Sequence, residues 1–129
     1  MADMSNVLEV DLLNSTLNGA AFTPVDNPYV SLWTSDPTDA ETGTEVSGGS
    51  YARIASSFPT ATTNTVATDA DVTFAEATST WGTVGWIGLH SASTGTGNMI
   101  YHTALDAAKT IDTGDVFKIT VGNLTVTLD

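Results

Sequence analysis

The chain of 129 residues has the length of one domain and is long enough to bury a hydrophobic core without metals or crosslinks. With 15 acidic and three basic residues its formal net charge is −12, so its surface repels the phosphates of nucleic acids and anionic membranes. It has no cysteine, which excludes disulfides, thiolate metal sites and thiol nucleophiles, and neither a signal peptide nor a membrane span is recognisable. We therefore expect a soluble protein made in a reducing cytoplasm, with no nucleic-acid or membrane partner.

Residues 6–18 have the pattern of an amphipathic helix. Asn6 and Glu9 have the spacing of a capping box, and Asn18-Gly19 is a C-terminal stop signal. Apolar residues recur between them at three- and four-residue steps: Val7, Leu8, Leu12, Leu13 and Leu17. We predict that residues 1–28 form a helix and linker arm; the helix is a candidate docking element for a neighbouring subunit, and packing on its own domain is the alternative.

The remainder of the chain, residues 29–129, is rich in threonine, valine and glycine, a composition that favours strands joined by tight turns. Two-residue alternation predicts strands at residues 29–34, 51–58, 72–75, 81–90, 99–105 and 124–128. Residues 84–105 are expected to form a hairpin, and Leu124, Val126 and Leu128 are expected to point inward. The predicted fold is mainly β: an antiparallel, jelly-roll-like β-sandwich of about seven or eight strands, preceded by one α-helix.

A long polar segment, residues 36–50, is predicted to be a surface loop. It is followed by Arg53, one of only three basic residues in the chain. A lone guanidinium in so acidic a chain is expected to clamp carboxylates of the loop or of a neighbouring subunit. Calcium binding by the loop and an ordinary metal-free turn are the alternatives. The candidate clamp or partner-contact residues are Asp36, Asp39, Glu41, Glu45 and Arg53.

His90 and His102 are the only imidazoles, and both lie in the predicted hairpin. With a carboxylate they would form a metal site if all three faced one cavity, but no recognised ligand spacing is present. We therefore expect one histidine to be packed at an end of the sheet and the other to be solvated.

Enzymatic chemistry has no support in the sequence. There is no G-x-S-x-G motif, and Ser91, next to His90, would point to the opposite face of a strand. Paired carboxylates in an exposed loop lack the dry cleft that a glycosidase acid requires. We expect no catalytic residues, no cofactor and no metal. Trp33, Trp81 and Trp86 are expected in the core or at interfaces, with a sugar-stacking platform as the alternative.

Four stretches of the sequence resemble one protein family. In chain order they are SNVLEVDLLN, NPYVSLWTSDPTDAETGTEVSGGSYARIA, ADVTFAEATSTWGTVGWIGLHSASTGTGNMIYHTAL and KTIDTGDVFKITVGNLTVTLD. Together they resemble small tailed-bacteriophage virion proteins, often labelled phage tail fibre protein. The most specific motifs are T-S-D-P-T-D-A, G-T-E-V-S-G-G-S-Y-A-R and W-G-T-V. The resemblance implies a structural protein of the virion, and no catalytic residues are carried over from it.

Two functions are compatible with this resemblance. The absence of a repeated or coiled shaft favours a head decoration (cement) protein, a homo-oligomer and most simply a trimer, which binds the major capsid protein on the outer capsid surface and stabilises the shell. The alternative is a tail fibre or tail-associated protein that recognises a host-surface glycan through the loops at residues 36–50 and 91–98. Copy number separates them, because hundreds of copies per virion favour the head and a few favour the tail.

Overall fold

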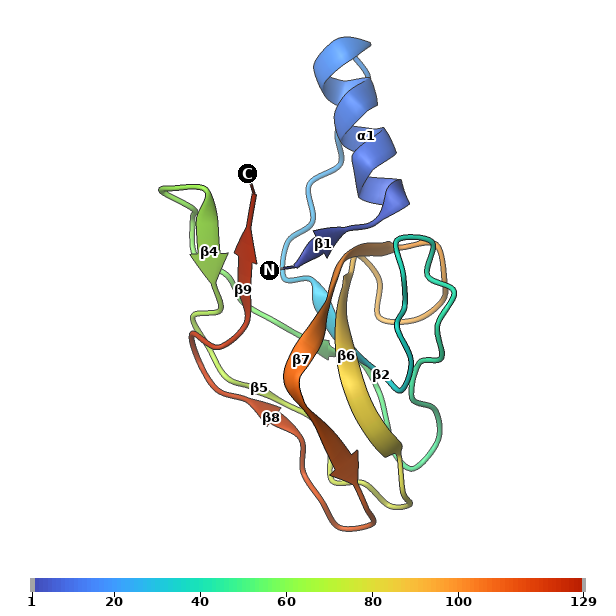
Figure 1. Ribbon diagram of the computed structural model, residues 1–129. Coiled ribbons are helices and arrows are strands. Elements are labelled where there is room, and N and C mark those ends of the chain that lie inside the picture. The colour runs from blue at the N-terminus through green and yellow to red at the C-terminus, as the bar shows by residue number, and fades with distance from the viewer. Residues whose placement is uncertain (1, 129) are drawn as a thin grey trace.

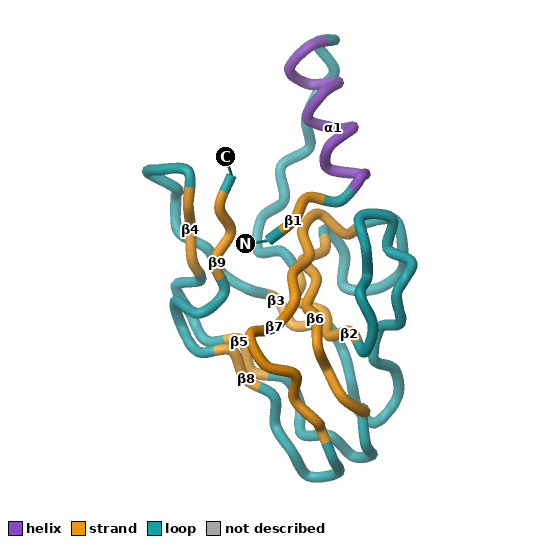
Figure 2. Tube along the Cα trace, in the orientation of Figure 1, coloured by secondary structure: helices purple, strands orange, loops and turns teal. Residues whose placement is uncertain are grey.

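A computed structural model describes residues 2–128, which contain one helix and nine strands (Figure 1, Figure 2). In chain order these are β1 (Asp3–Met4), α1 (Asn6–Leu17), β2 (Tyr29–Trp33), β3 (Ile54–Ala55), β4 (Thr65–Ala67), β5 (Val72–Thr73), β6 (Gly82–His90), β7 (Met99–Ile111), β8 (Lys118–Ile119) and β9 (Thr125–Thr127). All strand pairs are antiparallel. The mainly β, antiparallel fold with one N-terminal helix is confirmed.

The principal layer is a five-stranded sheet with the order β1-β7-β6-β2-β3. Its centre is the β6–β7 hairpin, which confirms the hairpin expected at residues 84–105 and continues to Ile111. On the other side of β6, β2 pairs along its whole length, from Tyr29 opposite His90 to Trp33 opposite Trp86. These two long pairings provide the rigid frame on which the loops are mounted.

Two ribbons, β4–β9 and β5–β8, form the second layer. The core lies between the layers, because its buried side chains come from both: Val30, Leu32, Val84 and Ile87 from the main sheet, and Val72, Phe74, Ile119 and Val126 from the ribbons and their ends. Each large aliphatic or aromatic group contributes about 1.5–3 kcal/mol when fully buried. Phe74 is central, with its ring 5.7 Å from Phe117 and 6.4 Å from Trp81.

A large irregularity interrupts the β6–β7 pairing. Val84 lies opposite Lys109 and Trp86 lies opposite Ala104, so that Gly85 alone faces residues 105–108 of β7. Extra residues on one strand bend it and increase its twist. The curved course of β7 in Figure 1 follows from this bulge, which carries the second half of the strand away from β1.

The helix begins at Asn6 as expected, but its N-cap lies one residue earlier than the predicted one. Ser5 is the N-cap, and its hydroxyl accepts a hydrogen bond from the N–H of Leu8, so the predicted capping role of Asn6 is wrong. The reason is tertiary, because the N–H of Asn6 donates to the carbonyl of Asp39 and fixes Asn6 within the helix. The predicted stop is confirmed, since Asn18 is the C-cap and Gly19 has a φ of 68°.

Other expectations need smaller corrections. The strand expected at residues 51–58 is reduced to β3, and β1 lies inside the predicted arm yet pairs with β7 in the main sheet. Leu124 and Val126 are buried as expected, whereas Leu128 is 40% exposed, because β9 has only the short ribbon β4 beside it. The division into an arm of residues 1–28 and a sandwich of residues 29–129 stays a prediction, and residue 129 lies outside the described part. No helix within residues 2–128 is long and apolar enough to cross a membrane.

Candidate functional site

Arg53 joins two loops at the end of the main sheet that carries α1. Its guanidinium is buried, and its Nε and Nη2 atoms each donate to one oxygen of the Glu45 carboxylate at 2.8 Å. The other donors reach acceptors in residues 91–98: the carbonyl oxygens of Ala92 and Gly95 and the side-chain oxygen of Asn98. With these five hydrogen bonds, the five N–H donors of the guanidinium are matched in number by acceptors. Arg53 therefore ties the acidic loop at residues 36–50 to the tip of the β6–β7 hairpin.

The electrostatics of the pair keep both partners charged. Burial by itself raises the pKa of Glu45, but hydrogen bonds from Arg53 and Tyr51 outweigh it and place that pKa below its usual value. Burial likewise opposes the charge on Arg53, but the contacts with Glu45 raise the guanidinium pKa. The Tyr51 hydroxyl donates to Glu45 at 2.7 Å and accepts from the N–H of Leu32, which links the clamp to β2.

His90 is a buried, neutral part of this end of the sheet. Its Nδ1 lies 2.9 Å from the side-chain oxygen of Asn98, which can only accept, so Nδ1 carries the proton. Its Nε2 accepts from the hydroxyl of Ser31 at 2.8 Å, and that hydroxyl accepts from the indole N–H of Trp33. Burial and the nearby positive charge of Arg53 lower the pKa of His90. The imidazole is thus held between β2 and the hairpin tip, and both of its nitrogens are hydrogen-bonded, which leaves none free for a metal.

His102 is also buried, although one of the two histidines was expected to be solvated. Its Nε2 lies 2.7 Å from the Asp39 carboxylate. The register of the hairpin places it opposite Gly88, beside the short strand β1 that covers this edge of β7. Within residues 2–128, no group of three or more His, Asp or Glu side chains is placed to hold a metal ion.

The predicted acidic residues do not converge on one point. Asp36 accepts from the N–H of Thr38 in a local turn, while Asp39 turns toward His102. Glu41 has a left-handed φ of 59°, and one of its oxygens accepts from the N–H of Gly97 in the hairpin tip. Its other oxygen lies 3.5 Å from Nδ1 of His90 and has no hydrogen-bond partner. Asp39, Glu41 and Glu45 therefore join the loop to different neighbours, whereas Asp36 stays within its own turn.

The base of α1 is fixed to this same end. The Ser5 hydroxyl donates to the carbonyl of Met99, and the N–H of Asn6 donates to Asp39. Beyond its first turn the helix stands away from the body, as Figure 1 shows, and Leu8 is its one buried residue. A cavity of about 410 Å³ lies between α1, residues 22–26 and the hairpin tip. Of the predicted docking residues, Leu8 faces the protein's own body, whereas Val7, Leu13 and Leu17 are exposed.

Comparison with known proteins places the chain in a family. Residues 3–127 match the model of the family Gp80, described as "Podophage GP4 fiber I protein gp80". The chain belongs to this family. No curated protein matches it. The resemblance to phage virion proteins labelled as fibres is confirmed, and a Gp80 member is a structural component of the virion that associates with other virion components.

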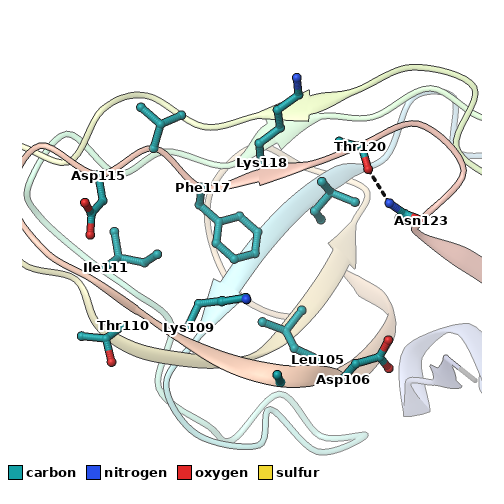
Figure 3. Close-up of a pocket in the computed structure, with 13 residues that line it drawn as sticks. Leu105, Asp106, Lys109, Thr110, Ile111, Asp115, Phe117, Lys118, Thr120 and Asn123 are labelled. Atoms are coloured by element: carbon teal, nitrogen blue, oxygen red, sulfur yellow. Dashed lines mark hydrogen bonds between the residues drawn. The ribbon is translucent and has the colours of Figure 1, made fainter.

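This Gp80 member has a second surface feature that the sequence did not reveal. A groove of about 530 Å³ lies between the β7 bulge and residues 115–123, with Phe117 and Ile119 in its wall. Figure 3 shows Lys109 extending into it beside Phe117, while Lys118 points away, where it pairs with Asp71 at 3.1 Å. Within the described residues, Lys109 is the one basic side chain without an ion pair. The groove depends on the β7 bulge, and the bulge arises from the register between β6 and β7. The alternation of apolar and polar residues within one strand does not indicate that register.

The three tryptophans differ in accessibility. Trp33 and Trp81 are 2% and 5% exposed, which confirms that they belong to the core. Their indole N–H groups donate to Ser31 and to the carbonyl of Gly49, so neither ring is available to stack on a sugar. Trp86 of β6 is only partly buried. In this Gp80 chain it is the most exposed of the three tryptophans.

Proposed function

We propose that this protein is a small fibre-type component of the phage tail that contributes to recognition of the host surface. The observation that carries the proposal is the match to a fibre-protein family over residues 3–127. The architecture supports it, because a β-sandwich with loops fixed by a buried ion pair is a rigid scaffold for contact with an external surface. The protein acts as a homo-oligomer attached to the particle through the end that carries α1.

The structure bears on which surface meets the host. The loops at residues 36–50 and 91–98 direct many of their polar groups toward each other through Arg53, Glu41 and Asn98. Those groups are therefore not free to bind a glycan. Trp86 offers an accessible indole, and aromatic rings are favourable faces for sugars. We infer that a host polysaccharide contacts the face of the main sheet that bears Trp86.

Binding to the host tests this proposal. Purified full-length protein is expected to co-sediment with host cells and to bind their purified surface polysaccharide, and Trp86→Ala is expected to reduce that binding severalfold. Phe22→Ala is the matched control, because Phe22 is an exposed aromatic residue that belongs to a different part of the surface. Absence of any binding by the wild-type protein would remove host recognition from the proposal.

A head decoration protein is the second candidate. It is favoured by the absence of a repeated or coiled shaft within residues 2–128. A compact protein of this kind can bind the outer capsid surface and stabilise the assembled shell. The partner would then be the major capsid protein and the oligomer a trimer. Quantitative mass spectrometry of purified virions separates the candidates: a few copies relative to the major capsid protein support the tail, and hundreds support the head.

A non-catalytic role is part of the proposal. Its support is chemical: the Ser31 hydroxyl beside His90 is fully buried and accepts from the indole N–H of Trp33, so a substrate cannot reach it, and His102 contacts only the Asp39 carboxylate. Incubation of the protein with host cell-wall and capsular polysaccharides is expected to release no new reducing ends. Measurable turnover that is lost in a point variant would overturn this part of the proposal.

A further inference from the structure

His90 is a buried titratable group that faces a buried carboxylate. The imidazole lies at the end of β6 and is 0% exposed. Glu41 approaches it from the acidic loop with a side chain that is 7% exposed, and its Oε1 lies 3.5 Å from Nδ1 of His90. That oxygen has no hydrogen-bond partner. Because an unpaired buried carboxylate oxygen is costly, its place beside an imidazole requires a physical reason.

Charged groups surround this imidazole on several sides. The titratable side chains on the segments packed around it are Asp39, Glu41 and Glu45 of the acidic loop, Tyr51 and Arg53 before β3, Tyr29 of β2 and His102 of β7. Two carboxylates, Glu41 and Glu45, and one guanidinium, Arg53, act on His90 through their charges. With His90 neutral, these groups carry one net negative charge, so one proton on the imidazole balances the cluster.

The Ser31 hydroxyl can match either protonation state of His90. When the imidazole is neutral, the hydroxyl donates to Nε2 at 2.8 Å. When Nε2 carries a proton, the hydroxyl can accept from it and turn its own O–H to the carbonyl oxygen of Gly88, which lies 3.3 Å away. A hydroxyl accepts through two lone pairs, so the indole N–H of Trp33 keeps its hydrogen bond in both states. A proton at Nε2 therefore leaves no donor unpaired on this side of the ring.

On the other side of the ring, Nδ1–H has two acceptors within reach. In the neutral state it donates to the side-chain oxygen of Asn98 at 2.9 Å, and that oxygen also accepts from Arg53 at 3.2 Å. A charged imidazole would share this one neutral oxygen with a guanidinium, and like charges repel. The unpaired Oε1 of Glu41 is a charged acceptor, and a cation forms its stronger hydrogen bond with such an oxygen.

Asn98 is the residue through which this choice affects the hairpin tip. Its side-chain amide donates to the carbonyl oxygens of Thr94 and Thr96, inside the tip. Its side-chain oxygen accepts from Arg53 and His90, which belong to the body of the sheet. Loss of the hydrogen bond from His90 therefore removes one of the ties between the tip and the sheet.

The backbone holds Glu41 in position at a cost. Its φ of 59° is left-handed, an uncommon conformation for a residue other than glycine. The second carboxylate oxygen accepts from the N–H of Gly97, so the side chain stays fixed beside the imidazole. Backbone conformations of this kind persist where the surrounding structure requires them, often at switches and binding sites.

We propose that His90 is a proton-operated switch of the hairpin tip. With a neutral imidazole, Nδ1–H donates to Asn98 and residues 91–98 are tied to the sheet. When Nε2 takes up a proton from solvent, Nδ1–H turns to Oε1 of Glu41, and the tip loosens while Arg53 still holds it. Burial and the charge of Arg53 lower the pKa of His90, so the switch operates below the ordinary value of 6.5. The switch is a property of the isolated chain and is independent of its place on the virion.

Nitrogen NMR of the imidazoles in the purified full-length protein tests the proton site. His90 is expected to carry its proton on Nδ1 at neutral pH and to titrate with a midpoint below 6.5. Glu41→Gln should lower that midpoint by about one unit, because the imidazolium loses its carboxylate. Asp39→Asn is the matched control, since Asp39 belongs to the same loop but faces His102, and it should leave the His90 midpoint unchanged. An unchanged midpoint in Glu41→Gln, an equal shift in both variants, or unfolding before His90 titrates contradicts the proposal.

Amide hydrogen exchange on either side of that midpoint tests the movement. After correction for the intrinsic effect of pH, residues 91–98 should exchange about fivefold faster below the midpoint, as for the loss of one hydrogen bond. The first turn of α1 is the internal control, because Ser5 ties it to Met99 without His90, and its exchange should not change. His90→Gln, whose side-chain amide can donate to Asn98 at any pH, should abolish the difference in the tip. Equal acceleration in the tip and the helix, or no acceleration in the tip, would overturn the proposal.

Discussion

Replacement of Arg53 by alanine is the perturbation whose consequence the structure defines most closely. The change removes five hydrogen bonds and leaves the Glu45 carboxylate, whose side chain is 23% exposed, without its cation. Removal of one partner of a buried ion pair lowers the free energy of unfolding by about 3–5 kcal/mol. Partial exposure of Glu45 places the expected loss near the lower end, about 3 kcal/mol. At about 4 °C per kcal/mol for a chain of this size, the melting temperature should fall by roughly 12 °C.

Thermal unfolding followed by circular dichroism measures this loss, and amide hydrogen exchange should show faster exchange at residues 91–98. Lys118→Ala is the matched control, because it breaks an exposed ion pair and should leave the melting temperature nearly unchanged. The double variant Arg53→Met/Glu45→Leu should be more stable than Arg53→Ala, because it leaves no buried charge. The pKa of Glu45 is lowered in the folded protein, so the stabilisation is present above its unfolded value of about 4.5 and is lost as the pH falls through the folded value. The difference between wild type and Arg53→Ala should therefore shrink in acid, and an unchanged melting temperature at pH 7 would refute the clamp.

Three further predictions follow from the same region. Because the folded pKa of His90 lies below its ordinary value of 6.5, the stabilisation by the neutral imidazole is complete above that pH and declines below it. The free energy of unfolding from urea titrations of the wild type should fall with decreasing pH by up to about 1.4 kcal/mol per pH unit, and His90→Gln should flatten that slope. A Cβ at Gly43 would lie 2.4 Å from the carbonyl oxygen of Asp36, so Gly43→Ala should cost about 1–3 kcal/mol, whereas Gly85→Ala, which meets no atom within 4 Å, should cost far less; equal midpoints in urea would contradict the packing of this turn. Loss of the N-cap in Ser5→Ala should weaken the protein by about 0.5–2 kcal/mol and speed exchange in the first turn of α1, and unchanged exchange would place the cap elsewhere.

Local patterns in the sequence were sufficient for much of the fold. The helix at residues 6–18, the strand beginning at Tyr29 and the β6–β7 hairpin each depend on spacing within one short segment. The N-cap shows the limit of such reasoning, because Asn6 and Ser5 are both good caps and the choice is made by Asp39, distant in sequence. Strand register has the same limit, since the bulge opposite Gly85 arises from the pairing of two strands.

The candidate sites were predictable only in part. The rarity of arginine in an acidic chain singled out Arg53, and the structure places it against Glu45, one of the predicted carboxylates. Its contacts with Ala92, Gly95 and Asn98 span about forty residues and could not be read from spacing. The periodicity of α1 gave its apolar residues, but not the division into a buried and an exposed face, because Leu8 and Leu13 are equally apolar and only the packing of β7 distinguishes them.

Cryo-electron microscopy of the intact virion tests the central claim most directly, because it locates the chain on the particle. The account predicts β-rich density of this size in a few symmetry-related copies on the tail, attached through the end that carries α1. Density in hundreds of copies over the capsid surface, or a mature particle that lacks this polypeptide, would contradict it.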